Sequence, residues 1–179
     1  CSCAFATIAT LEGLWQIRTG ELKSLSVQYL VDCDLGSNGC KGGTFDSAFK
    51  FATTTHNGAI PSEYDYPFKR IQQTCNNDII GAAGFDGYRF LYPGDEQQLL
   101  LAVAQQPVAV SIASGHYEFY HFRGDGIYSG PCGSNVSHGV AIVGYGESAD
   151  GQKYWIIKNS WGVKWGDLGY MKLARGTGH

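Results

Sequence analysis

Residues 137–161 read SHGVAIVGYGESADGQKYWIIKNSW, and this stretch does most to decide which fold the sequence can adopt. It holds two short apolar runs, HGVAIVGYG and KYWIIKN, separated by polar residues and glycine. Short apolar runs bounded by turn residues are typical of buried β-strands. The runs VAVSIA, from Val108, and GYMKLA, from Gly169, have the same character. The sequence therefore predicts a second half that is mostly strand.

The residues before this stretch follow a helical pattern instead. Apolar side chains recur at helical spacing from Ala4 to about Thr19, and Gly20 is placed to end a helix there. We expect this helix to be central and buried. Shorter helices are predicted at about 26–32, 44–55 and 95–106, separated by loops rich in Gly, Asn and Pro.

The change from helical to strand periodicity divides the chain into two parts. We expect an α+β fold with a helical lobe at residues 1–88, followed by a β-rich lobe at residues 89–179. A cleft between two lobes is the usual place for a ligand, so the active site is expected there.

Composition and charge exclude several classes of protein. The 179 residues are 44% hydrophobic and 16% charged, which is typical of a folded globular chain and not of a disordered one. The formal net charge is -3 and no basic run occurs, so we expect no nucleic-acid partner. No apolar stretch approaches the roughly 20 residues of a membrane-spanning helix, so we expect no membrane partner.

Six cysteines are many for a protein of a reducing compartment and favour the secretory pathway. If one of them is a free catalytic thiol, the remaining five cannot all pair within the chain. Zinc binding is disfavoured, because the gaps Cys1 to Cys3 and Cys33 to Cys40 match no usual ligand spacing. We therefore predict no metal site.

Cys3 is a candidate nucleophile because it stands at the start of the first predicted helix. An ordinary thiol is only about 3% thiolate at neutral pH, so a positive neighbour must lower its pKa. The N-terminal end of the helix and a histidine from the second half can both supply such a field. Judged by position alone, a structural cysteine is the commoner interpretation.

Short motifs around Cys3 and downstream of it favour the catalytic interpretation over the structural one. They occur in the order Cys1-Ser2-Cys3-Ala4-Phe5-Ala6, Leu30-Val31-Asp32-Cys33-Asp34, Gly39-Cys40-Lys41-Gly42-Gly43, Ser137-His138-Gly139 leading into Gly144-Tyr145-Gly146, Tyr154-Trp155-Ile156, and Asn159-Ser160-Trp161-Gly162 with Trp165-Gly166. This set closely resembles the papain-like cysteine proteases of the cathepsin L and papain type, and the ending RGTG resembles the plant branch. The resemblance implies a two-lobe fold with a barrel-like second lobe and the cleft between the lobes.

The resemblance also implies catalytic roles for three residues. Cys3 matches the nucleophile, His138 the general base and later general acid, and Asn159 the amide that orients the imidazole. Trp161 matches a residue that keeps water off the contact between His138 and Asn159.

A second set of residues matches the family's substrate-binding positions. Gly42 and Gly43 resemble paired glycines that line the cleft, where a Cβ would block an extended substrate. Ser111 and Gly139 align with the pocket for the substrate side chain two residues before the scissile bond. Trp161 completes the predicted substrate-binding set.

The disulfide pattern is likewise taken from the resemblance. It pairs Cys1 with Cys40 and Cys33 with Cys75 in the helical lobe. Cys132 resembles a cysteine whose usual partner lies in a later segment. On this interpretation the chain is incomplete at both ends.

The implied activity is that of a cysteine endopeptidase, which forms a thiolate–imidazolium pair and hydrolyses peptide bonds through a covalent thioester on Cys3. It needs no metal and no organic cofactor. Polypeptide substrates, protein inhibitors of cysteine proteases and a monomeric state are expected. The resemblance implies a secreted, vacuolar or lysosomal location.

The sequence also departs from the family pattern. The family motif is CGSCWAF, whereas this chain has Cys1-Ser2-Cys3-Ala4-Phe5, without the glycine and the tryptophan. A true one-residue deletion would rotate the preceding residues by about 100° and shift them by about 1.5 Å, which should misplace the thiol. Since the register is kept from Ala4 onward, we interpret the omissions as gaps in the sequence. The alternative is a catalytically impaired homologue that acts as a binding or storage protein.

Three smaller features complete the expectations. Val27 and Tyr29 replace family glutamates, so apolar packing should replace carboxylate contacts there. Asn135 begins a glycosylation sequon, where a glycan would crowd the cleft. Surface placement is expected for the remaining histidines, which are His56, His116, His121 and His179.

Overall fold

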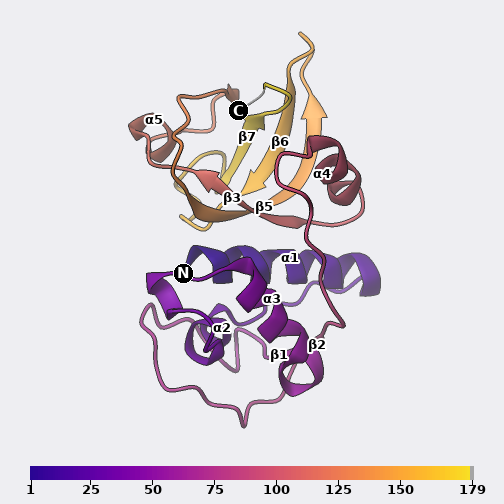
Figure 1. Cartoon of the computed structure of the whole chain (residues 1–179), viewed down its shortest axis with the longest axis vertical. Coiled ribbons are helices and arrows are strands. Elements are labelled where there is room, and N and C mark those ends of the chain that lie inside the picture. Colours follow the sequence, from indigo (N-terminus) through magenta and orange to yellow (C-terminus); the bar gives the residue numbers. More distant parts are fainter. Residues whose placement is uncertain (178–179) are drawn as a thin grey trace. The chain divides into compact units, whose positions relative to one another are not determined.

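The computed structural model describes residues 1–177, apart from the side chains of His56 and Asn57. The chain forms two compact units, here called unit 1 (Cys1–Phe90) and unit 2 (Leu91–His179) (Figure 1). His179 lies outside the described residues, as does the side chain of His56, so the expectations for these two histidines are not addressed.

Unit 1 contains the helices predicted for the first half of the chain. Its elements are α1 (Ser2–Thr19), α2 (Val27–Cys33), η1 (Gly39–Lys41), α3 (Phe45–Thr54), η2 (Thr55–Gly58), β1 (Ala59–Ile60) and β2 (Ala83–Gly84). The two strands pair antiparallel. The sequence pattern did not predict them, because strands of two residues leave no periodic signal.

Local caps explain where these helices begin and end. Gly20 adopts a left-handed conformation with φ of 78°, and its N–H donates to the carbonyl of Gln16, which closes α1. At the starts of α2 and α3, the side chains of Ser26 and Thr44 each accept a backbone N–H three residues ahead. The predicted helix boundaries are therefore confirmed to within one or two residues.

The core of unit 1 forms where α1, α2 and α3 meet. Ile8 and Leu11 of α1 pack in one cluster with Tyr29 of α2 and Ala52 of α3. The expectation of a buried first helix is wrong for its last turn, because Ile17 is 58% exposed. As expected, the positions that carry glutamate in the family pack as apolar residues: Val27 is buried, and the Tyr29 ring contacts Phe51 and Tyr66.

Two disulfides lie within unit 1, and they join the pairs implied by the resemblance. One links Cys1 to Cys40 and the other links Cys33 to Cys75. The first holds the start of α1 against η1, and the second ties the end of α2 to a long loop. The second disulfide therefore connects a helix with a segment that has little regular structure of its own.

Unit 2 is built on a five-stranded sheet. Its elements are α4 (Glu96–Val103), β3 (Val108–Ala113), α5 (Tyr117–Tyr120), β4 (Ile127–Tyr128), β5 (Val136–Glu147), β6 (Lys153–Lys158) and β7 (Tyr170–Ala174). The strand order is β3-β5-β6-β7-β4, in which only β4 and β7 run parallel. The four apolar runs quoted from the sequence form β3, β5, β6 and β7. Figure 1 shows α4 and α5 as separate short helices of this unit.

The helix predicted at 95–106 is shorter than expected. It begins as predicted, because the Asp95 side chain accepts the N–H of Gln98. It ends at Val103, and Gln105 and Gln106 leave the helix before Pro107, which disfavours helical conformation in the preceding residue. Neither α5 nor β4 was predicted, since both are too short to show a period.

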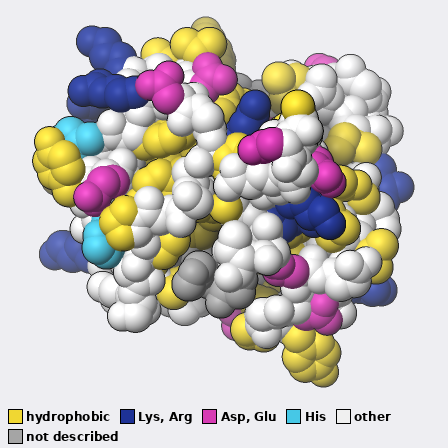
Figure 2. All heavy atoms as spheres, turned by 90° about the horizontal axis from the view of Figure 1, so that it is seen from above, with side chains coloured by type: hydrophobic (Ala, Val, Ile, Leu, Met, Phe, Trp, Pro, Cys, Tyr) yellow, Lys and Arg dark blue, Asp and Glu magenta, His cyan; other side chains and the backbone are white. Residues whose placement is uncertain are grey.

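The core of unit 2 is rich in aromatic side chains. One cluster includes Phe119, Tyr128 and Trp165 with Val140, Ile157 and Met171. A second cluster places Val103 of α4 against Ile142 and Trp155 of the sheet. On the face shown in Figure 2, cationic and anionic side chains are interspersed, and neither sign forms a continuous patch.

Candidate active site

Cys3 lies in the first turn of α1, and its thiol is a free, half-buried group. The Sγ–H donates to the carbonyl oxygen of Gly43 over 3.3 Å. Burial raises the pKa of the Cys3 thiol, because a thiolate is solvated less well away from water. Within unit 1 alone, Cys3 is therefore held as a thiol that points at the paired glycines.

Gly42 and Gly43 follow η1, and the local structure favours glycine at both positions, through the backbone conformation of Gly42 and the close approach of Ser37 to Gly43. Gly42 has φ of 150°, a conformation that disfavours a side chain, and its carbonyl accepts the N–H of Asn38 over 2.8 Å. A Cβ on Gly43 would come within 2.6 Å of the Ser37 hydroxyl oxygen. The structure thus gives these glycines a role in shaping the chain next to Cys3.

His138 and Asn159 are brought together by neighbouring strands of unit 2. The pairing of Ala141 with Lys158 sets the start of β5 beside the end of β6. His138 Nε2 then lies 2.8 Å from Asn159 Oδ1. The same oxygen accepts the N–H of Ser160 over 2.8 Å, which identifies it as the carbonyl oxygen of the amide. Nε2 is therefore the donor, and the other ring nitrogen, Nδ1, remains for chemistry.

The environment of His138 opposes its protonation. The residue is 8% exposed, and burial lowers the pKa of the imidazole below its usual value. The hydrogen bond to Asn159 acts in the opposite direction and raises the pKa, but it is the smaller of the two effects. Asn159 is itself buried, and its backbone N–H donates to the carbonyl of Gly169 over 3.0 Å.

Trp161 covers the imidazole of His138 with its ring. Its ring stacks on His138 with the centroids 4.8 Å apart and the planes inclined by 28°. It also stacks on Tyr120, with 4.7 Å between centroids and 19° between planes. Phe119 and Trp165 contact it edge-on.

Sequence reasoning missed Phe119, Tyr120 and Trp165 as supports of the site. A hydrogen bond fixes the position of Trp165, because its Nε1–H donates to the carbonyl of Phe119 over 3.1 Å. The available signal was the density of rings in Tyr117-Glu118-Phe119-Tyr120-His121-Phe122, which is high for a loop. A short helix, α5, turns two of these rings toward Trp161.

Ser111 and Gly139 are brought together by the pairing of β3 with β5, in which their Cα atoms are partners. The adjacent pair in this ladder is Ile112 with His138. Gly139 is buried and Ser111 is exposed. The two residues predicted to share a specificity pocket are therefore neighbours, one position along the strands from the imidazole.

The other notable side chains of unit 2 lie outside this arrangement. His121 is exposed, as expected, and its Nδ1 lies 2.9 Å from the carbonyl of Tyr117. His116 is partly exposed, 3.9 Å from Glu118. Cys132 is free and exposed, and Asn135 of the sequon is also exposed.

Two further observations bear on cofactors and membranes. Among residues 1–177, no group of three or more His, Cys, Asp or Glu side chains is placed to hold a metal ion. No helix in this part of the chain is both long enough and apolar enough to cross a membrane.

Comparison with known proteins identifies the family of the chain. The family model described as papain family cysteine protease matches residues 1–179. The thiol protease SEN102 of Hemerocallis sp. is 47% identical over 179 residues, covering 98% of this chain and 49% of that protein. The senescence-specific cysteine protease SAG12 of Arabidopsis thaliana is 45% identical, covering 98% of this chain and 50% of that protein. The chain thus spans about half the length of these curated relatives.

Solved structures show the same fold. The bromelain protease of Ananas comosus, in complex with the E64 inhibitor, has a TM-score of 0.91 at 38% identity, covering 99% of this chain and 81% of that one. The Carica candamarcensis cysteine protease CMS1MS2, in complex with E-64, has a TM-score of 0.90 at 38% identity with the same coverage. The family model, the relatives and the fold agree over nearly the whole sequence, so this chain belongs to the papain family of cysteine proteases.

Proposed function

We propose that this chain is a cysteine endopeptidase in which Cys3 attacks the peptide carbonyl, His138 handles the proton and Asn159 orients the imidazole. The observation that carries the proposal is the buried pair of His138 and Asn159 under the ring of Trp161. A histidine that is held by one nitrogen and shielded from water has the other nitrogen free to exchange a proton with a nucleophile. Family membership supports this assignment, since relatives are named as thiol proteases and cysteine endopeptidases.

The reaction follows from these groups. The proton of Cys3 passes to Nδ1 of His138, and the thiolate forms a bond to the substrate carbonyl carbon. The imidazolium then gives the proton to the departing amine, which leaves a thioester. Water attacks the thioester with His138 as base, and the acid product and the free thiol are released.

The ionisation of the pair depends on the two groups meeting. Burial raises the pKa of Cys3 and lowers the pKa of His138, so each group alone favours its neutral form. Opposite charges in contact favour the charged forms, and this attraction must exceed both effects of burial for the ion pair to form. The thiol must also give up its hydrogen bond to Gly43.

The same proposal covers substrates, partners and location. The substrates are polypeptides, which extend past Gly42 and Gly43 and place a side chain near Ser111 and Gly139. Protein inhibitors of cysteine proteases are expected partners, and the chain is expected to act as a monomer. The two disulfides support a secreted, vacuolar or lysosomal location.

A second candidate function is that of a catalytically impaired binding or storage protein. It is favoured by the hydrogen bond from the Cys3 thiol to Gly43, together with the shortened motif around Cys3. A thiol that stays protonated would bind peptides in the same place without cleaving them.

Selective labelling separates the two candidates. The native protein is treated with an epoxysuccinyl peptide inhibitor, and the labelled peptides are identified by tandem mass spectrometry, which also reads the sequence around Cys3. Cys132 is an exposed free thiol and serves as an internal control. An active protease takes the label on Cys3 and not on Cys132, and loses it in the His138→Ala variant. Equal, slow labelling of both thiols would support the impaired homologue.

A further inference from the structure

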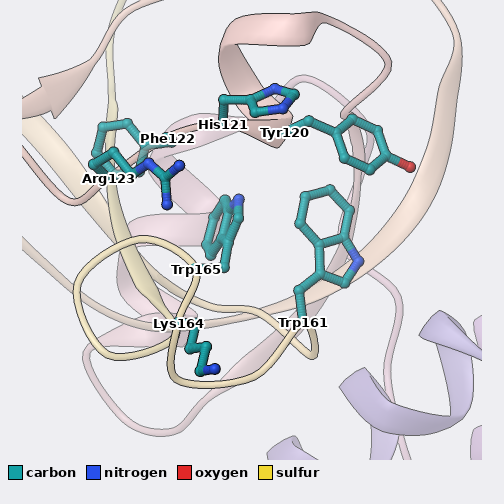
Figure 3. A pocket seen from close by; sticks show the side chains of 7 residues that line it. All are labelled: Tyr120, His121, Phe122, Arg123, Trp161, Lys164 and Trp165. Carbon is teal, nitrogen blue, oxygen red and sulfur yellow. The ribbon is translucent and has the colours of Figure 1, made fainter.

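A surface pocket of about 330 Å³ lies within unit 2, and Trp161 forms one of its walls. The sequence analysis did not predict this pocket. The rings of Tyr120, Phe122, Trp161 and Trp165 line it, together with the imidazole of His121. Figure 3 shows these rings around one hollow, with Tyr120 and Trp161 side by side. The walls are thus suited to an apolar or planar group.

The side chains of fixed charge that line this pocket are all positive. Arg123 and Lys164 contribute to it, and no carboxylate does. Figure 3 shows the Arg123 guanidinium near the ring of Trp165, whereas the Lys164 side chain points away from the rings, from the loop that carries both tryptophans. Both cations are exposed, and neither forms an ion pair with any residue in the described part of the chain. A chain of net charge -3 therefore keeps two uncompensated cations around one aromatic hollow.

The position of the pocket relative to His138 indicates which part of a substrate would reach it. The imidazole gives its proton to the departing amine, so the residues after the scissile bond begin beside this ring. Trp161 stacks on the same ring at 4.8 Å and is also a wall of the pocket. The pocket therefore starts one ring away from the place where the departing segment begins.

We propose that this pocket binds a carboxylate carried on an apolar stem in the departing segment of the substrate. The aromatic walls hold the stem, and the Arg123 guanidinium holds the carboxylate. The inference rests on the proposed endopeptidase function and gives it a preference on the side of the departing group. The carboxylate can come from an acidic side chain or from the free end of a peptide.

The test uses short fluorogenic peptides that differ only after the scissile bond. One pair carries Glu or Gln at the first or second departing residue and has an amidated end. A second pair keeps Gln and differs only in a free or amidated end. We expect the carboxylate to raise kcat/KM about fivefold at low salt, the effect of a good exposed ion pair, and to lose this advantage in high salt. The pair that shows the effect identifies the source of the carboxylate.

Variants connect the preference to the pocket. Arg123→Gln should abolish most of the advantage, and Arg123→Glu should reverse it in favour of peptides with Lys at that position. Lys153→Gln is the matched control, since it removes one exposed positive charge from β6, away from the pocket lining. Equal rates within both peptide pairs in the unaltered enzyme, Glu against Gln and free against amidated end, would overturn the proposal. So would an advantage that Arg123→Gln leaves intact.

A binding measurement tests the carboxylate preference of the pocket independently of whether the chain cleaves peptides. The same peptides are titrated into a Cys3→Ser variant, and tryptophan fluorescence is followed, because two of the four tryptophans line the pocket. Tighter binding of the carboxylate peptides, abolished by Arg123→Gln, supports the pocket even if the native chain cleaves nothing. Active enzyme without any carboxylate preference in binding or rate would refute the pocket and leave the proposed function standing.

Discussion

At the scale of single residues, His138 is subject to two opposing influences whose balance sets its chemistry. Burial under Trp161 lowers the pKa of the imidazole, and the Asn159 amide raises it. In the proposed endopeptidase, the charge of the ring before substrate binds depends on this balance together with Cys3. Each influence belongs to a different side chain, so each can be removed alone.

We expect Asn159→Ala to lower the pKa of His138 further, because the hydrogen bond that favours the imidazolium is lost. Asn159→Asp should raise the pKa, because a carboxylate in the same place stabilises the charged ring. NMR titration of the imidazole C–H signals measures both shifts. Asn135→Ala, an exposed asparagine of the same unit, is the control and should leave the titration unchanged. A shift of the same sign in both Asn159 variants would contradict the assigned hydrogen bond.

The lowered pKa of His138 also predicts how stability depends on pH. The unfolded chain takes up the proton near the ordinary histidine pKa of about 6.5, while the folded chain takes it up only at lower pH. Unit 2 should therefore lose stability as the pH falls below about 6.5, until the folded-state pKa is reached. Urea unfolding at a series of pH values measures this slope. The slope should be smaller in His138→Gln, and an unchanged slope would show that other groups cause it.

The residues of the site differ in how well the sequence alone predicted them. The resemblance to papain-like proteases implied a pairing of His138 with Asn159, and their side chains lie in hydrogen-bond contact. The ring of Tyr120 on Trp161 was not predicted, because a contact between a short helix and a distant loop leaves no pattern in either segment. Lateral packing of this kind is decided by tertiary structure and not by local sequence.

At the scale of elements, α2 depends on one buried cap. Ser26 Oγ accepts the N–H of Tyr29 over 2.9 Å and donates to the carbonyl of Tyr66 over 2.6 Å. Thr44 caps α3 in an exposed position with one bond, from the Ser47 N–H over 3.2 Å. Both side chains cap a helix, but one is buried and the other exposed. Removing each cap therefore shows how much burial adds to its contribution to stability.

We expect Ser26→Ala to lower the free energy of unfolding by about 2 to 3 kcal/mol, since it removes a cap and leaves a buried carbonyl without a partner. Thr44→Ala should lower it by about 1 kcal/mol. Urea denaturation followed by circular dichroism gives both values. A larger loss for Thr44→Ala than for Ser26→Ala would refute the argument from burial.

The elements also show where sequence patterns succeed. Long periodic segments such as α1 and β5 were predicted, because many residues contribute to each pattern. The pairing of β1 with β2 and of β4 with β7 was not predicted. A strand of two residues forms only because a partner strand is nearby, and its own sequence shows no pattern. The early end of α4 reflects the proline that follows it.

At the scale of the whole molecule, the two units should differ in how they respond to reduction. Both disulfides lie in unit 1, and the Cys33–Cys75 bridge closes a loop with a sequence separation of 42. Replacing Cys33 and Cys75 by serine should lower the free energy of unfolding of unit 1 by about 4 kcal/mol, through the added freedom of the unfolded chain.

Hydrogen exchange read by mass spectrometry tests this for each unit separately. Peptides from α2 should lose protection in the double variant, while peptides from β5 and β6 should keep it. Equal loss of protection in both sets would show that the units unfold together. The sequence placed the change of periodicity near residue 88, and the structure divides the chain between Phe90 and Leu91.

The strand order of unit 2 has a consequence for how the protein is made. β7 lies between β6 and β4, so β4, which is synthesised more than forty residues earlier, has no neighbour in the sheet until β7 exists. A ribosome delivers the chain from its N-terminal side, and residues 1–90 form a compact unit of their own. Unit 1 can therefore fold on the nascent chain, whereas unit 2 must wait with Ile127 and Tyr128 unpaired until residues 170–174 have left the exit tunnel. We therefore expect a stage of synthesis in which Cys3, the proposed nucleophile, is already in a folded setting while the sheet of unit 2 is still incomplete.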